Sequence, residues 1–66
     1  MEILVNGEPR IVGDGATVRS LLRELSLPES RVAVERNRSL VRKAEFENAA
    51  LAEGDRIEIV TFVGGG

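Results

Sequence analysis

The feature that most limits this fold is the absence of any residue that could cross-link it: the 66 residues include no cysteine and no histidine. A disulfide, a zinc–thiolate site and an imidazole ligand are all excluded, so stability must come from packing. A domain of about 60 residues buries only about 60% of the surface that its unfolded chain exposes. The sequence therefore predicts one small domain without a deep active-site cleft.

The charge balance argues against nucleic acid as a partner. Nine Lys and Arg stand against 11 Asp and Glu, and two Phe are the only aromatic residues, which leaves little to neutralise phosphates or stack on bases. No apolar run approaches the roughly 20 residues of a membrane span, and the start lacks a basic signal-peptide head. We expect a cytoplasmic protein with no nucleic-acid partner, no membrane partner and no bound metal.

The first twelve residues predict a β-hairpin. Residues 1–5 alternate as a strand does, and Arg10-Ile11-Val12 form a return strand after Pro9. Asn6-Gly7 between them is a strong hairpin signal, because both residues tolerate a positive φ.

The register of this hairpin has two solutions. A two-residue loop would pair Ile3 with Arg10, which places a charged residue on the buried face. A loop of about four residues would set Ile3 opposite Val12 and Leu4 opposite Ile11. We expect the longer loop, because it keeps apolar residues together.

An amphipathic helix follows. Thr17 occupies an N-cap position, and Pro28 marks the end, since the residue before proline avoids helical geometry. The apolar residues between them recur at helical spacing: Val18, Leu21, Leu22 and Leu25.

The second half of the chain predicts mainly β structure. We expect a strand at 32–34, an edge strand at Leu40-Val41, an irregular or 3₁₀ turn between Phe46 and Leu51, a turn at 53–55 and a long strand at 56–63. If the first and last strands pair in parallel with the helix across one face, the result is α+β. This is the ubiquitin-like β-grasp, a mixed sheet of four to five strands with one main helix. Residues 1–63 would form the domain and 64–66 a flexible tail.

The chain ends in Gly64, Gly65 and Gly66. Three glycines pack poorly and lose much entropy when ordered, which is typical of a frayed end. They also form a thin strip that could carry an α-carboxylate through a narrow channel of a partner enzyme. Spacing alone leaves these two interpretations level.

Six stretches carry a resemblance to a known family: residues 1–7 (MEILVNG), 15–18 (GATV), 21–22 (LL), 32–37 (VAVERN), 53–60 (EGDRIEIV) and the terminal glycines. In this order and at this length, they resemble the ThiS family, the ubiquitin-like β-grasp sulfur carriers of thiamin biosynthesis. The family often has Asn-Gly after its third strand and then Val-Pro-Arg and an aromatic residue. Here Arg38 follows Asn37, and Val41-Arg42-Lys43 leads to Phe46 without a proline.

The resemblance implies a mechanism for the tail. An E1-like adenylyltransferase would use ATP to adenylate the Gly66 carboxylate, and sulfur from a cysteine desulfurase or another donor would displace AMP. The resulting thiocarboxylate would pass its sulfur to a thiazole synthase. The chain would be a co-substrate with no catalytic residue and no bound cofactor. The alternatives are a small subunit of molybdopterin synthase, a non-reactive β-grasp binding module and a ubiquitin-like modifier.

A docking surface for the partner is expected beside the tail. If Ile57 and Ile59 point inward, then Val60 and Phe62 lie on the opposite face. Leu4 shares that face, as would Ile11 with the longer hairpin loop. The alternative is that Phe62 folds over the edge of the sheet and Val60 is an isolated surface residue.

Two charged stretches are assigned no site. The acidic residues near the last strand are interpreted as a solvated face that could steer a basic partner, and the basic ones as a blunted sheet edge. The first group is Glu53, Asp55 and Glu58, and the second is Arg36, Arg38, Arg42 and Lys43.

Overall fold

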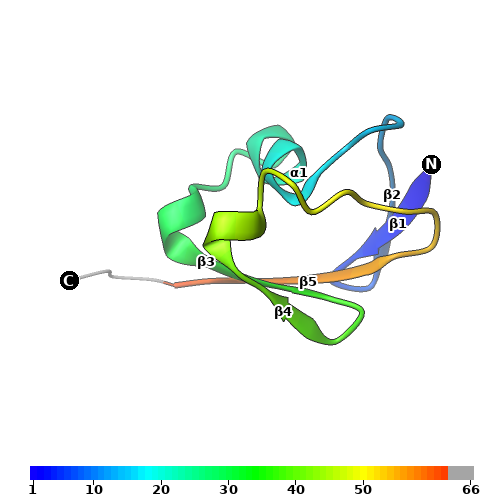
Figure 1. Ribbon diagram of the computed structural model, residues 1–66. Helices are drawn as coiled ribbons and strands as arrows, with labels where there is room; N and C mark the ends of the chain where they lie inside the picture. Colours follow the sequence, from blue (N-terminus) through cyan, green and yellow to red (C-terminus); the bar gives the residue numbers. More distant parts are fainter. Residues whose placement is uncertain (63–66) are drawn as a thin grey trace.

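The computed structural model describes residues 1–62, which form two hairpins, a helix between them and a last strand (Figure 1). In chain order the elements are β1 (Glu2–Val5), β2 (Glu8–Ile11), α1 (Val18–Glu24), the 3₁₀ turn η1 (Glu29–Arg31), β3 (Val32–Arg36), β4 (Ser39–Val41), the 3₁₀ turn η2 (Lys43–Glu45) and β5 (Arg56–Thr61).

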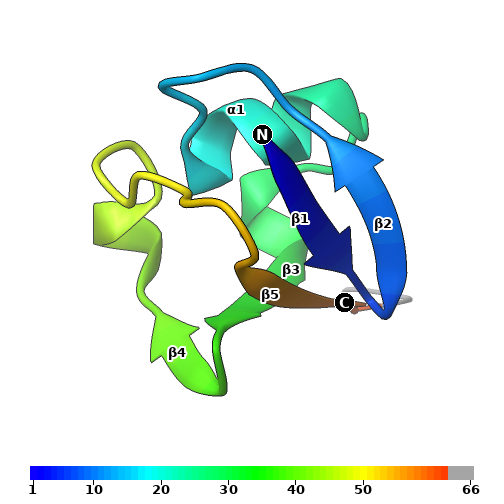
Figure 2. The same cartoon turned by 90° about the vertical axis from the view of Figure 1, so that its right-hand side faces the viewer.

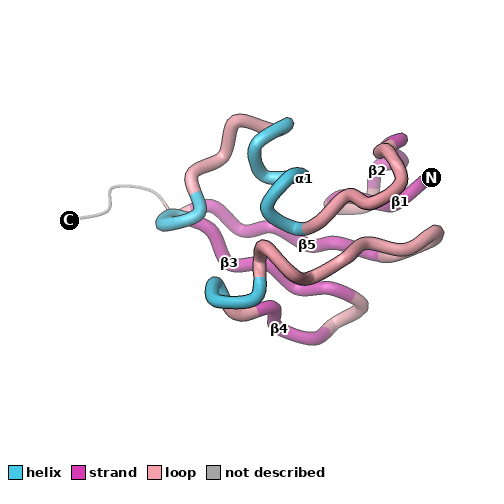
Figure 3. Tube along the Cα trace, turned by 45° about the horizontal axis from the view of Figure 1, so that its top comes forward, coloured by secondary structure: helices cyan, strands magenta, loops and turns pink. Residues whose placement is uncertain are grey.

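The strands form one mixed five-stranded sheet in the order β2-β1-β5-β3-β4. The last strand in the sequence is therefore the central one, parallel to β1 on one side and antiparallel to β3 on the other (Figure 3). Figures 1 and 2 show α1 across one face of this sheet. The α+β fold with parallel first and last strands and one helix, expected from the sequence, is confirmed.

The register expected for the first hairpin is wrong. Asn6 and Gly7 have φ values of 50° and 84° and form a two-residue turn, so Ile3 lies opposite Arg10 and not opposite Val12. The turn chemistry of Asn-Gly outweighs the pairing of apolar residues. The charge is accommodated because the Arg10 side chain reaches α1, where its Nη2 lies 3.4 Å from Oε1 of Glu24.

Capping residues define both ends of α1. The Thr17 hydroxyl accepts a hydrogen bond from Ser20 N–H at 3.1 Å, and Ser20 Oγ accepts one from Thr17 N–H at 2.8 Å. The helix ends at Glu24, before the position where Pro28 would terminate it. It ends there because Ser26 takes a φ of 58° and Leu27 N–H donates to the Leu22 carbonyl. This is a Schellman motif with serine in the position that glycine usually takes.

The core lies between α1 and the sheet. It joins the helical residues to β1, β3 and β5, and Phe46 and Leu51 are also part of it. The 3₁₀ turn itself precedes Phe46 and does not follow it. The fully buried side chains of largest volume are Ile3, Val18, Leu21, Leu22, Val32, Val34, Phe46 and Ile57.

Candidate functional site at the end of the last strand

The outer face of β5 carries two exposed apolar residues next to the predicted tail. Ile57 and Ile59 point into the core, so the alternate residues point away from α1. Val60 is 59% exposed and Phe62 is 52% exposed. The Phe62 N–H donates to the Arg31 carbonyl at 2.8 Å, which continues the pairing with the β3 side past the end of β5. Both side chains are therefore presented by ordered backbone.

Leu4 shares this face but lies at the other end of β5. It is half-buried and pairs with Arg56 in the parallel register, four residues before Val60. The three residues predicted as one docking surface are therefore divided into Leu4 near the start of β5 and Val60 with Phe62 near its end. Their role in docking stays a prediction.

Two other large apolar residues are exposed: Ile11, which the longer hairpin loop was expected to place on the same face as Leu4, and Leu40, which was not part of the predicted surface. Ile11 is 71% exposed at the end of β2, and Leu40 is 69% exposed on the edge strand β4. Leu40 lies opposite Glu35, and Glu35 lies opposite Glu58 on β5. Carboxylates thus separate Leu40 from the pair Val60 and Phe62.

Two asparagines anchor β5, one at each edge. The Asn6 side chain accepts a hydrogen bond from Ile59 N–H at 2.7 Å and donates one to the Ile59 carbonyl at 3.2 Å. On the other edge the Asn37 side chain accepts from Arg56 N–H at 2.9 Å. Both asparagines belong to hairpin turns, which the sequence analysis identified only at Asn6.

Asp55 was interpreted as part of a solvated face, and this is wrong. It is only 5% exposed, and its carboxylate accepts hydrogen bonds from Arg36 Nε at 2.9 Å, Asn37 Nδ2 at 3.1 Å and Ala52 N–H at 2.8 Å. Burial raises its pKa, but the bonds from these three donors together outweigh burial and hold the pKa below its usual range. The signal in the sequence was its position directly before a central strand, where an acceptor can bond the preceding turn.

The basic stretch was interpreted as a blunted sheet edge, and Arg36 does not fit that interpretation. It lies on β3 next to the central strand, and it pairs with Asp55. The role of Arg36 is therefore to pair with Asp55 in front of β5, and not to protect an edge of the sheet.

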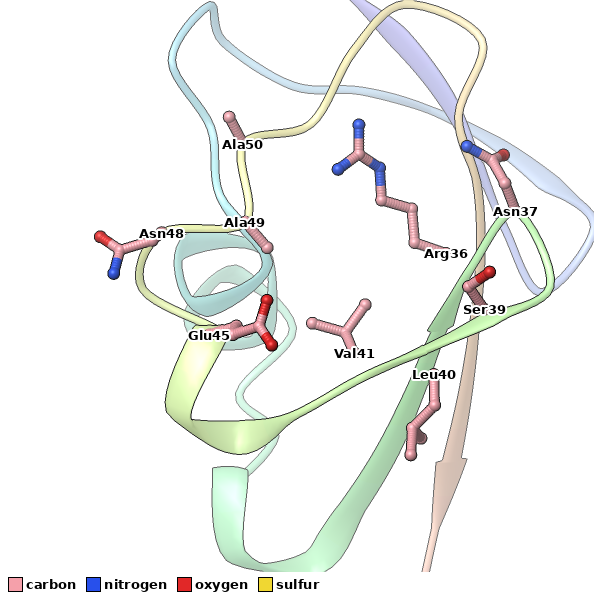
Figure 4. Close-up of a pocket in the computed structure, with 9 residues that line it drawn as sticks. All are labelled: Arg36, Asn37, Ser39, Leu40, Val41, Glu45, Asn48, Ala49 and Ala50. Atoms are coloured by element: carbon pink, nitrogen blue, oxygen red, sulfur yellow. The ribbon is translucent and has the colours of Figure 1, made fainter.

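A hollow of about 570 Å³ lies between the β3–β4 hairpin and the segment after η2 (Figure 4). Its walls include Arg36, Val41, Glu45 and Asn48, and Figure 4 shows Leu40 pointing away from it. Arg36 ends β3, whereas Phe62 bonds next to the start of β3. The hollow is therefore at the far end of the strand from the tail.

No group of three or more metal-binding carboxylates, thiols or imidazoles occurs within residues 1–62. In the same part of the chain, no helix has the length and apolar character needed to cross a membrane. The predicted reactive residues Gly64, Gly65 and Gly66 lie outside the described residues.

The fold and the tail sequence define a class, the small β-grasp carriers. The ThiS family model matches residues 3–66, and the chain belongs to this family.

Individual relatives agree with this assignment. The crystal structure of the thiamine biosynthesis protein ThiS from Geobacter metallireducens superposes with a TM-score of 0.84 at 32% identity over the full length of both chains. The sulfur carrier protein ThiS of Bacillus subtilis is 42% identical over 53 residues, 80% of each chain.

A third relative is much longer. A thiazole synthase of Paramagnetospirillum magneticum is 44% identical over all 66 residues, and the chain spans about a fifth of that protein, 20% of its length. A protein named thiazole synthase thus includes a region similar to the whole of this chain.

Proposed function

We propose that the Gly66 carboxylate is the sulfur-carrying group. An oxygen of this carboxylate attacks the α-phosphorus of ATP on an E1-like adenylyltransferase, and pyrophosphate leaves. A sulfur nucleophile then attacks the carbonyl carbon, AMP leaves and a thiocarboxylate remains. With bisulfide one proton is also released, and with a persulfide from a cysteine desulfurase a thiol must reduce the acyl disulfide. The observation that carries the proposal is the family match, which extends through residue 66.

The acceptor that we propose is the thiazole ring under construction on a thiazole synthase. The relative that carries a region like this chain within a protein of that name supports this choice. A carrier that must meet this enzyme gains effective concentration when the two are covalently joined.

The test uses the intact mass of the chain after incubation with an E1-like adenylyltransferase of the thiamin pathway, ATP, Mg²⁺ and bisulfide. We expect the mass gain of one sulfur replacing one oxygen. Deletion of Gly66 should abolish the gain, while the control Gly13→Ala should keep it, because no atom within 4 Å obstructs a Cβ there. High-mass conjugates would indicate a protein modifier, and an unchanged mass would contradict the proposal.

We further propose that, of the predicted docking residues, Val60 and Phe62 beside the tail make the main contact with the adenylating enzyme, and that half-buried Leu4 at the other end of β5 lies at the margin of this surface. Exposed apolar residues close to a processed tail are suited to this, since buried aromatic anchors supply much of the energy of protein interfaces. Phe62→Ala should weaken binding about tenfold, equivalent to about 1.4 kcal/mol, and change stability by less than about 0.5 kcal/mol. Leu40→Ala, at an exposed apolar residue on β4 that Glu35 and Glu58 separate from Val60 and Phe62, is the control. Normal binding by Phe62→Ala with a large stability loss would contradict the assignment.

A further inference from the structure

The edge of β5 that faces β1 loses its partner strand before β5 ends. The parallel pairing joins Leu4 to Arg56 and Val5 to Ile57, and β1 then stops at Val5. β5 continues to Thr61. Ile59 and Thr61 have the same backbone orientation as Ile57, since alternate residues of a strand direct their N–H and C=O groups to the same edge. Their backbone groups therefore face a position where no strand of residues 1–62 lies.

The side chain of Asn6 fills the first of these positions. Its backbone N–H donates to the Ile57 carbonyl at 2.8 Å, which completes the ladder of β1. Its carboxamide then bonds both the N–H and the carbonyl of Ile59, at 2.7 Å and 3.2 Å. One side chain thus provides the donor and the acceptor that a further strand residue would have provided.

Beyond Ile59 this edge of β5 borders a hollow of about 440 Å³, lined by Asn6 and Thr61 among others. Asn6 therefore makes the last hydrogen bonds along this edge among the described residues. The opposite edge stays paired to β3 and to Arg31 as far as Phe62. Without the Asn6 bonds, the outer part of β5 would be held along one edge only.

We infer that Asn6 is a positioning residue for the chemistry at Gly66, an inference that rests on the proposed function. By fixing Ile59, it sets the direction of the last described residues of the chain, Val60 to Phe62, which directly precede the tail. A partner that grips the outer face of β5 receives the tail in one orientation only if this segment keeps its place. Misplacement by about 1 Å can cost as much as about 100-fold in rate.

The chain offers a clean variant and a matched control. Asn6 has a φ of 50°, which glycine adopts without strain, so Asn6→Gly keeps the turn and removes only the side-chain bonds. Asn37 has the same φ and anchors the other edge of β5 at Arg56, the end remote from the tail. Asn37→Gly also loses the bond to Asp55, so it should destabilise the chain at least as much.

The experiment measures ATP–pyrophosphate exchange by the E1-like adenylyltransferase as the concentration of each carrier is varied, at a temperature where all variants are folded. For Asn6→Gly we expect kcat about tenfold lower with KM within twofold, and Asn37→Gly within twofold in both. Hydrogen exchange of the Ile59 amide, measured without the enzyme and corrected for the global stability of each variant, should be faster in Asn6→Gly than in wild type or Asn37→Gly. Asn6→Asp keeps the acceptor for Ile59 N–H and should fall between the wild type and Asn6→Gly in this exchange.

Three results would overturn the inference: unchanged kcat in Asn6→Gly, an equal loss in both glycine variants, or a rise in KM alone, which would indicate direct contact with the enzyme. Each of these leaves the role of Gly66 intact if deletion of Gly66 still abolishes exchange. Exchange that survives this deletion would instead overturn the proposed function itself.

Discussion

The two hairpin turns of the molecule have nearly the same backbone and very different support. Asn6-Gly7 joins β1 to β2 with φ values of 50° and 84°, and Asn37-Arg38 joins β3 to β4 with 50° and 72°. Both therefore place two residues in the left-handed region, as in a type I′ turn. In both, the asparagine side chain accepts a backbone hydrogen bond from the central strand, from Ile59 in one case and Arg56 in the other.

The two asparagines differ in the other groups to which they are hydrogen-bonded. Asn37 also donates to the buried Asp55, which in turn pairs with Arg36, so the turn beside the start of β5 belongs to a polar network. Asn6 bonds β5 alone and borders an open hollow. The difference shows that several groups fix the end of β5 remote from the tail. At the end that leads to the tail, β3 and Arg31 hold one edge, and the Asn6 carboxamide makes the hydrogen bonds of the other edge among the described residues.

Removing the network should give the largest effect. In Asp55→Asn the amide replaces one carboxylate oxygen by an NH₂ group, so at least one of the three donors loses its acceptor. We expect a loss of about 2–3 kcal/mol in the free energy of unfolding near pH 7, measured by urea denaturation. Asp14→Asn, at an exposed position, is the control and should change it by less than about 0.5 kcal/mol. A similar loss in both would show that the network adds nothing.

The same comparison has a pH dependence. The pKa of Asp55 is lower in the folded chain than in the unfolded one, so its contribution is complete above the unfolded value of about 3.9. It is lost as the pH falls through the lower, folded value. The stability difference between wild type and Asp55→Asn should therefore be constant from pH 7 to pH 5 and shrink below about pH 4. A difference that stays constant into that acidic range would contradict the assigned role.

A smaller effect is expected at the second residue of the first turn. No atom lies within 4 Å of a Cβ built on Gly7, so a substitution there is opposed by its φ of 84° alone. Gly7→Ala should cost about 1 kcal/mol in thermal or urea unfolding. Gly13→Ala, where φ is not positive and space is also open, should be close to neutral. Equal values for the two variants would mean that the turn is less tightly defined than its dihedral angles indicate.

The smallest expected effect is a gain in stability, at Arg38. Arg38 occupies at φ 72° the position that glycine holds in the first turn. Arg38→Gly relieves a left-handed conformation worth about 1–2 kcal/mol but adds about 0.5–1 kcal/mol of chain entropy in the unfolded state. We expect a net gain of about 0.5 kcal/mol. Destabilisation would show that the Arg38 side chain makes a stabilising contact of its own.

The sequence predicted those elements whose signals are local. The leucine spacing and Thr17 identified α1, and Asn6-Gly7 identified the first turn, because a repeat of 3.6 residues and a tolerance of positive φ act over a few residues. The departure noted at Arg38 did not abolish the second turn. Tertiary contact of Asn37 with β5 compensates for the strain.

The parts that sequence reasoning missed depend on groups far apart in the chain. The register prediction was wrong because it gave the Asn6-Gly7 turn too little weight, and it did not foresee that the Arg10 side chain reaches Glu24, 14 residues away. Asp55 was taken for a surface acid because its partners Arg36 and Asn37 come from another hairpin. The hydrogen bond from Ile59 N–H to the Asn6 side chain spans 53 residues, and nothing in the local sequence of β5 indicates it.

The central place of β5 also governs how the molecule can be assembled. Each hairpin closes over a few residues, so both can form while the chain is still emerging from a ribosome. The two halves share no strand ladder until residues 56–61 insert between β1 and β3. Insertion requires closure of a loop of about 50 residues, which slows it relative to the local steps. A nascent chain arrested before residue 56 would therefore expose both β1 and β3 as open edges, and chaperones would meet it in that form.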